Sequence, residues 1–317
     1  MTIRDCKQSD NESVRQLFKK VFNKEHADSY WEWKYRQPPV PPIVLVWEEN
    51  GTITGHIAVW VLPAYVKGQP AEIGLRIDTM VDPDARGKGI YRQLNQEMMK
   101  RAAEADIQML YGFPSPMAQA PLLKYTAASH KTDIARWMTT FPILSSAGKK
   151  KHEGVVERIT AFDSRFDKLA EAVKDQAEVH VMKSAAFLNW RYQSHPVHSY
   201  ITLGLFKEGK LKGFIVVKKE KKTIKKIPVN IGSIVDISAV EQKDTDALLA
   251  RGIGELKSCA AVQLWTLPGS KLETSLRKLR FQKKDHPLPF VTHNLTHDAS
   301  LDEPENWLIA QGDVDSF

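Results

Sequence analysis

The chain has 317 residues, of which 42% are hydrophobic and 26% charged, with a net charge of +7 and a pI near 9.1. This length can bury a sizeable core and suggests two domains, and no apolar run approaches the roughly 18–20 residues that cross a bilayer. A polar start over residues 1–10 and two cysteines, Cys6 and Cys259, argue against a secreted disulfide scaffold and favour a cytoplasmic protein.

The first predicted elements alternate between helix and strand. Apolar residues recur at helical spacing from Val14 to Phe22, and alternating stretches over 43–47 and 57–61 flank a glycine turn, which predicts a β-hairpin. The following predicted elements are a strand over 71–81, a helix over 90–105, a strand over 107–113 and a short helix over 121–125. This order predicts a mixed α/β layer fold.

A second copy of this pattern follows later in the chain. Trp33-Lys34-Tyr35 resembles Trp190-Arg191-Tyr192, each with a proline soon after, and a second glycine-centred hairpin follows the second triplet. Gly74 and Asp78 recur as Gly232 and Asp236, 158 residues further on in both cases. We therefore predict a first copy over 1–144, a connector over 145–174, a second copy over 175–296 and an acidic tail over 297–317.

The most informative segment joins the strand over 71–81 to the helix over 90–105. It reads Asp82-Pro83-Asp84-Ala85-Arg86-Gly87-Lys88-Gly89. Two glycines allow the backbone to turn tightly and to approach a ligand closely. Free N–H groups and the helix dipole favour an anion at the start of the following helix, and Arg86 and Lys88 add positive charge there. A pyrophosphate is the expected guest.

This segment resembles the acetyl-CoA loop of the GNAT superfamily of N-acetyltransferases, in which Arg/Gln-x-x-Gly-x-Gly/Ala follows a strand often ending in Val-x-Pro. The chain supplies Arg86, Gly89 and Val81-Asp82-Pro83, and departs from the pattern at Tyr91. The resemblance implies two tandem GNAT-like domains, the second degenerate because Ser238 to Asp244 lacks the glycine loop. It also implies that acetyl-CoA is bound by Met80, Val81, Arg86, Gly87, Lys88, Gly89, Ile90 and Tyr91.

Two residues are the catalytic candidates. An attacking amine must lose a proton, and Asp78 lies on the strand that approaches the loop, where alternation places it on the same face as Glu72. Its recurrence as Asp236 in the copy without the loop favours a structural role instead. Tyr125 resembles the GNAT tyrosine that protonates the departing thiolate; the alternative is a core tyrosine. His56 is interpreted as an ordinary packed or surface histidine.

These features predict an N-acyltransferase that moves an acetyl group to a primary amine of a small molecule. An amino sugar is the favoured acceptor, because the Trp-Arg/Lys-Tyr signature loosely resembles GNAT-like proteins of cell-surface polysaccharide metabolism. Aminoacyl transfer of the tandem cell-wall type and a non-catalytic CoA-binding module remain the alternatives. No metal motif occurs, membrane insertion is not expected, and the lysine run over 218–226 lacks the aromatic residues of a nucleic-acid surface. The oligomeric state stays open.

Overall fold

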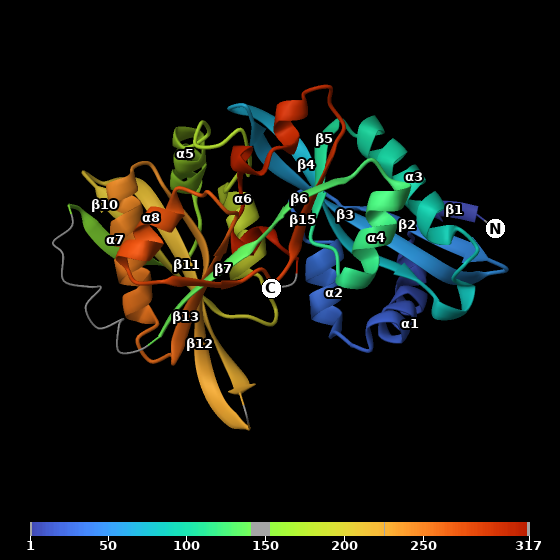
Figure 1. Cartoon of the computed structure of the whole chain (residues 1–317), viewed down its shortest axis with the longest axis horizontal. Coiled ribbons are helices and arrows are strands. Elements are labelled where there is room, and N and C mark those ends of the chain that lie inside the picture. Colours follow the sequence, from blue (N-terminus) through green and yellow to red (C-terminus); the bar gives the residue numbers. More distant parts are fainter. Residues whose placement is uncertain (1, 141–152, 225, 316–317) are drawn as a thin grey trace. The chain divides into compact units, whose positions relative to one another are not determined.

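The protein is described by a computed structural model that covers residues 2–140, 153–224 and 226–315 (Figure 1). It divides into two compact units, and each unit contains a mixed β-sheet with helices. The first unit comprises Met1–Ala64, Pro70–Lys131 and Pro289–Asp302. The second comprises Tyr65–Gln69, Thr132–Leu288 and Glu303–Phe317. The predicted α/β architecture in two copies is confirmed.

The first sheet has the strand order β1-β2-β3-β4-β5-β15-β6. Its strands are β1 (Thr2–Asp5), β2 (Ile43–Glu49), β3 (Thr52–Val66), β4 (Gln69–Val81), β5 (Ile107–Gly112), β6 (Ser129–Asp133) and β15 (Pro289–Asn294). The helices of this unit are α1 (Asn11–Phe22), α2 (Asp28–Tyr35), α3 (Ile90–Glu104) and α4 (Pro116–Tyr125). The predicted β2–β3 hairpin is confirmed, and α4 begins earlier than expected because Pro116 occupies its first turn, where proline is well tolerated.

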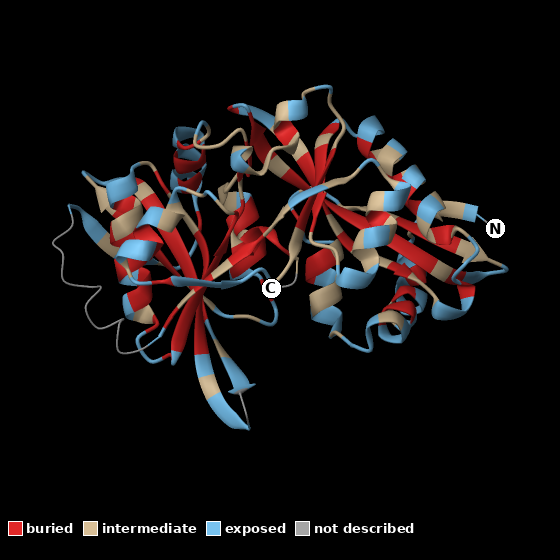
Figure 2. Cartoon of the chain, viewed as in Figure 1, coloured by how far each residue is buried: buried red, intermediate tan, exposed pale blue. Residues whose placement is uncertain are grey.

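Both faces of the first sheet are covered, because successive side chains of a strand point to opposite faces. On β2, Leu45 and Trp47 pack with Leu94 of α3, in a core that continues through β3. The intervening Val46 packs with Phe18 and other apolar residues of α1. Figure 1 shows α3 on one side of these strands and α1 and α2 on the other, and Figure 2 shows the strands between them to be largely buried.

The second sheet has the order β14-β7-β13-β12-β11-β10-β8. Its strands are β7 (Ala135–Thr140), β8 (Val155–Ile159), β10 (Tyr200–Lys207), β11 (Lys210–Ile224), β12 (Ile227–Ala239), β13 (Ala261–Thr266) and β14 (Gln282–Asp285). The helices of this unit are α5 (Ser164–Ala172), α6 (Ala185–Leu188), α7 (Gln242–Glu255) and α8 (Leu272–Lys278). As in the first unit, a hairpin (β10–β11) precedes a parallel strand pair, here β12 with β13.

The two copies exchange one strand each. β7 comes from the first half of the chain but pairs with β13 and β14 of the second sheet. Conversely, β15 follows the second copy in sequence but lies between β5 and β6 of the first sheet. The domain boundaries predicted at 144 and 175–296 are therefore corrected. Local periodicity identifies a strand but does not specify which sheet it joins.

Two other segments also differ from the predicted domain map. Part of the predicted connector forms β8 and α5 of the second unit, whereas the proposed exposed stretch 145–151 lies outside the described residues. The predicted tail folds into ordered structure: β16 (Trp307–Leu308) pairs with β9 (Val179–Val181), and Trp307 is buried. Asp313 lies beside Lys183, and Arg191 donates to the carbonyl oxygens of Gly312 and Val314. The tail is therefore packed against basic residues.

The lysine run lies on the β11–β12 hairpin. Among its described members, Lys219, Lys221 and Lys222 lie on β11, and Lys218 is buried and paired with Glu220 at 2.7 Å. A solvated strand and turn therefore accounts for most of the run. None of the helices in the described ranges is both long and apolar enough to cross a membrane.

Candidate active site

The glycine loop between β4 and α3 adopts a conformation that few other residues accept. Gly87 has φ +84° and Gly89 has φ +76°, in the left-handed region where a Cβ is strained. Gly89 is the N-cap of α3, and no side chain caps this helix end. The first N–H groups of α3 therefore lack intrahelical acceptors, and the 15-residue helix directs its positive dipole end toward the loop.

A cavity of about 670 Å³ opens at this helix end. The loop and the first turn of α3, from Arg86 to Arg92, form one wall. Val21 and Phe22 at the end of α1 and residues of α4 form other walls. Lys88 pairs with Glu49 at 3.2 Å and is half exposed. The cavity thus has a basic end rich in N–H donors and an apolar end. This combination suits a phosphorylated molecule that also carries an extended, narrow chain.

The two central strands separate beside this cavity. β4 and β5 pair in parallel from Glu72 with Ile107 to Leu75 with Tyr111. β4 then continues to Val81 beyond the paired register, so the strands diverge toward the loop. Thr79 and Val81 line the cavity from this unpaired end. Such a gap exposes backbone groups of β4 to a ligand.

The sequence of this unit matches a known family. The family model described as "Acetyltransferase (GNAT) domain" matches residues 2–121, which span β1 to α4 and include the loop and its cavity. Residues 2–121 are a GNAT domain. No curated protein matches the chain in sequence.

Solved structures extend the likeness to both units of the chain. A GCN5-related N-acetyltransferase from Anabaena variabilis has a TM-score of 0.73 at 12% identity, over 93% of this chain and 73% of that one. One from Kribbella flavida has a TM-score of 0.68 at 12% identity, over 93% and 71% of the two chains. At these identities the likeness concerns the fold, and the protein is a tandem of two GNAT-like folds.

The structure brings most of the predicted cofactor residues together in the GNAT domain. All of those from Arg86 to Tyr91 line the cavity, and so does Val81. Met80 differs: its side chain is buried with Val14 and Leu17 of α1, so only its backbone could take part. Tyr91, which departs from the family pattern, is half-buried, and burial raises the pKa of its phenol. Its carbonyl accepts a hydrogen bond from Asn95, so the departure is accommodated within α3.

Tyr125 lies in the same cavity as the loop. It is the last residue of α4, and 38% of its surface is exposed. The alternative interpretation as a core tyrosine therefore does not fit its position. Lys124 places its ammonium 5.3 Å from the centre of the Tyr125 ring. The phenol is thus free to meet a ligand within the cavity.

Asp78 occupies a different environment from the one predicted for a base. It is buried, with Lys34 Nζ at 2.7 Å and the Tyr35 hydroxyl at 2.5 Å from its carboxylate. Burial alone would raise the pKa of Asp78, but the Lys34 ammonium and the Tyr35 hydroxyl hold it below its ordinary value. A carboxylate bound in this way is a weak proton acceptor, and Asp78 does not line the GNAT cavity.

A break in strand alternation explains where Asp78 points. A Cβ added at Gly74 would meet Val59 and Leu110, which belong to the core on the α3 side of the sheet. Arg76, two residues further on, donates a hydrogen bond to Asn95 of α3. By strand alternation Asp78, two residues further on, should also face α3. It contacts α2 instead, because its φ of +42° interrupts the alternation. The prediction that Glu72 and Asp78, six residues apart, lie on one face of the strand is therefore wrong.

The second unit repeats this cluster without the loop. Asp236 accepts a hydrogen bond from the Tyr192 hydroxyl at 2.7 Å and pairs with Lys183 at 2.8 Å. No glycine stands between β12 and α7, and Gly252 and Gly254 lie inside α7. Because the carboxylate–tyrosine–lysine cluster occurs in both copies, it accounts for the recurrence of the tyrosine and the aspartate as a structural feature. His195, which follows this cluster in the chain, accepts hydrogen bonds from the backbone of Val197 and His198.

One residue with an unusual environment was not singled out from the sequence. His56 of β3 is fully buried, and its Nδ1 lies 2.8 Å from the carbonyl oxygen of Asp78. No residue that the structure describes gives its Nε2 a hydrogen-bond partner. A single usable signal existed in the sequence: the matching position of the second copy, 158 residues on, is Phe214, so the imidazole belongs to the GNAT domain alone.

Proposed function

We propose that the protein is an N-acetyltransferase that uses acetyl-CoA bound in the cavity of its GNAT domain. The observation that carries this proposal is the convergence, in one cavity, of the left-handed glycine loop, the uncapped start of α3 and the Tyr125 phenol. Acetyl-CoA would supply the acetyl group as a reactive thioester. A primary amine of a small molecule, such as an amino sugar, is the proposed acceptor.

Different residues would bind different parts of acetyl-CoA. The backbone N–H groups of Gly89 and Ile90 and the side chain of Arg86 would hold the pyrophosphate. The unpaired end of β4, near Met80 and Val81, would offer a backbone N–H to the thioester carbonyl. The hydroxyl of Tyr125 would donate a proton to a thiolate formed in the cavity that it lines.

The test is a binding and turnover experiment on the full chain. We expect acetyl-CoA to bind in calorimetry and CoA to be released when a suitable amine from a panel of amino sugars, amino acids and polyamines is added. Binding without turnover on any amine would favour the non-catalytic CoA-binding module. Absence of binding by a folded protein would overturn the proposal and favour aminoacyl transfer, against which the intact loop speaks at present.

Replacing Tyr125 by phenylalanine should separate binding from chemistry. Tyr125→Phe removes only the hydroxyl, so acetyl-CoA should bind as before while the rate of CoA release falls by about 10²–10⁴-fold, the usual contribution of a positioned acid. The matched control is Tyr91→Phe, which removes another hydroxyl from the same cavity. Equal losses of rate in the two variants, or no loss in Tyr125→Phe, would remove Tyr125 from the mechanism.

A further inference from the structure

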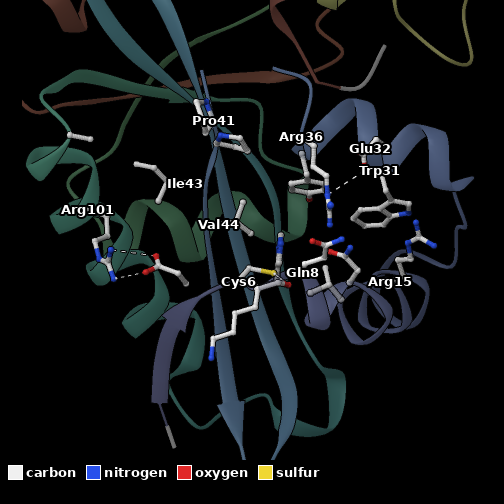
Figure 3. A pocket seen from close by; sticks show the side chains of 18 of the residues that line it. Cys6, Gln8, Arg15, Trp31, Glu32, Arg36, Pro41, Ile43, Val44 and Arg101 are labelled. Carbon is white, nitrogen blue, oxygen red and sulfur yellow. Dashed lines mark hydrogen bonds and ion pairs between the residues drawn. The ribbon is translucent and has the colours of Figure 1, made fainter. Parts of the chain in front are cut away.

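The two copies differ in the open space that they enclose. Besides the cavity at the glycine loop, the first copy has another of about 670 Å³ beside α1 and α2 (Figure 3), with His56 in its lining. In the second copy, Phe214 stands at the position of His56 and is buried, with its ring centre 5.6 Å from that of Phe166 on α5. An aromatic contact thus replaces an imidazole that lines a cavity.

The counterpart of the acetyl-CoA cavity can be located in the second copy from its elements. β12 begins and ends 158 residues after β4, and its pairing with β13 stops at Ile234, so these two strands also diverge. α5 precedes the Trp-Arg-Tyr triplet as α1 precedes Trp-Lys-Tyr, and α8 follows β13 as α4 follows β5. A small cavity lies among these elements, lined by Val173 after α5, Ile237 of β12 and Leu272 of α8. Ile237 stands at the position of Thr79.

The chain itself fills this counterpart. Its volume is about 30 Å³, against about 670 Å³ for the loop cavity of the first copy, so it has no room for a ligand larger than water. Residues of the C-terminal segment 308–314 form one of its walls, and the short 3₁₀ helix Gln311–Asp313 contacts both β12 and β13. Ile309 and Val314 are buried. The segment therefore lies where the first copy is proposed to hold acetyl-CoA.

The C-terminal segment reaches the second unit as a separate piece of chain. The continuous part of this unit ends at Leu288, and the chain then runs through the first unit over Pro289–Asp302 before it returns. The last strand of the second sheet along the chain is β14, which ends at Asp285. The segment thus adds no strand to this sheet and contacts it as a bound peptide would.

Polar contacts of the kind that bind peptides hold the segment in place. Lys183 pairs with Asp236 at 2.8 Å and also with the carboxylate of Asp313. The Arg191 guanidinium donates hydrogen bonds of 2.9 Å to the carbonyl oxygens of Gly312 and Val314. The domain thus offers an ammonium to a side-chain carboxylate and a fork of N–H donors to the peptide backbone.

The backbone of the segment passes too close to Tyr192 for any side chain at Gly312. A Cβ added there would overlap the Tyr192 hydroxyl oxygen and would lie 3.0 Å from Cζ of the ring and 3.4 Å from Oδ2 of Asp236. The φ angle of Gly312 is outside the left-handed region, so the close approach, and not the backbone conformation, requires glycine. Tyr192 and Asp236 therefore form part of the surface that recognises the segment.

We infer that the second copy has become a peptide-binding domain whose ligand is the C-terminal segment of the same chain. The fold retains its ligand gap and lacks the glycine loop, and residues 308–314 occupy the gap. The segment docks as a separable ligand, so the second unit should stay folded and keep the segment bound when the covalent link to it is cut. The inference concerns the second copy alone and does not rest on the proposed function.

The test cuts this link in the full-length protein. A recognition site for a sequence-specific protease is inserted between Asp302 and Glu303, at the boundary between the two units. The uncut insertion variant should melt as the wild type does, which establishes that the insertion is tolerated. After cleavage, size-exclusion chromatography at micromolar concentration should recover the fragment 303–317 together with the rest of the protein. An excess of synthetic peptide with the same sequence should exchange with the fragment.

Gly312→Ala should weaken the binding of the cleaved fragment about 10- to 100-fold, the usual effect of overpacking at a close contact. The loss should be smaller in the Tyr192→Phe background, which lacks the overlapping hydroxyl oxygen. Gly254→Ala is the matched control, because a Cβ added at Gly254 meets nothing within 4 Å, and it should leave the affinity unchanged. Equal losses in the two alanine variants would contradict the inference.

The cleaved wild type gives a decisive result even where a variant fails to fold. If the fragment separates and the remaining protein melts as before, the gap does not bind the segment. If the fragment is released only when the second unit unfolds, and the synthetic peptide does not rebind, the segment is part of the core and is not a ligand. Calorimetry with acetyl-CoA tests the proposed function separately, because neither of its outcomes changes the prediction for the peptide.

Discussion

The Gly89→Glu variant is expected to lose acetyl-CoA binding while remaining folded. Gly89 begins α3 in the left-handed region, and a Cβ built there has only the flexible end of Gln93 nearby, at 3.7 Å. A glutamate can therefore be accommodated sterically, but it brings a carboxylate to the end of the helix that would bind the pyrophosphate. Repulsion and occlusion should weaken binding at least about 100-fold in calorimetry, equivalent to ~2.7 kcal/mol.

The control for this variant is Gly209→Glu. Gly209 has φ +71° and lies in the hairpin turn of the second copy, where an added Cβ meets nothing within 4 Å. Both substitutions carry the same backbone strain, about 1–2 kcal/mol, so their melting temperatures should fall alike. Only the change at Gly89 should affect acetyl-CoA. Unaltered binding by Gly89→Glu, or equal loss in both variants, would place the cofactor elsewhere.

The second large effect concerns stability. Asp78→Asn should lower the free energy of unfolding of the first unit by about 3–5 kcal/mol, because it leaves the buried ammonium of Lys34 without its counter-ion. A fall of the melting temperature on the order of 10 °C should accompany this loss. The exposed pair of Lys19 and Glu25 offers a control, and Glu25→Gln should leave the melting temperature unchanged.

The pH dependence of this effect has a definite sign. The pKa of Asp78 is lower in the folded protein than in the unfolded chain, so the pair stabilises the fold above the unfolded value. The stabilisation disappears as the pH falls through the folded pKa, and wild type and Asp78→Asn should converge in acid, below about pH 4. If Asp78→Asn instead melts like the wild type and loses only turnover, Asp78 is the base and the structural interpretation fails.

The parts of the molecule that could be predicted from the sequence are those set by local chemistry. The glycine loop needs residues without a Cβ at particular positions, and Gly87 and Gly89 stand where the positive φ angles occur. The hairpins depend on alternation and on a turn glycine, so β2–β3 and β10–β11 were predicted, although β3 and β11 are longer than the alternating stretches. Tyr125 was chosen by its resemblance to the GNAT tyrosine, and it lies in the cavity.

The parts that could not be predicted depend on long-range packing. Strand alternation predicted that Asp78 points to the same face as Glu72. Its own left-handed backbone conformation directs it toward Lys34 instead. His56 looked ordinary because its distinguishing property, an acceptor nitrogen buried without a partner, arises only when α1, α2 and β4 close around it. The sheets that β7 and β15 join were not predicted, because the sequence of a strand does not indicate which strands it pairs with.

The exchange of β7 and β15 has a consequence for biosynthesis. A ribosome synthesises a chain from its N-terminus, so the GNAT domain emerges before the second copy. Its sheet nevertheless stays open between β5 and β6 until residues 289–294 have been made, after almost all of the second copy. Until then the nascent domain presents unpaired strand edges, which favour aggregation. Expression of residues 1–144 alone would leave that gap, so we expect a complete first sheet only in a chain that extends through residue 294.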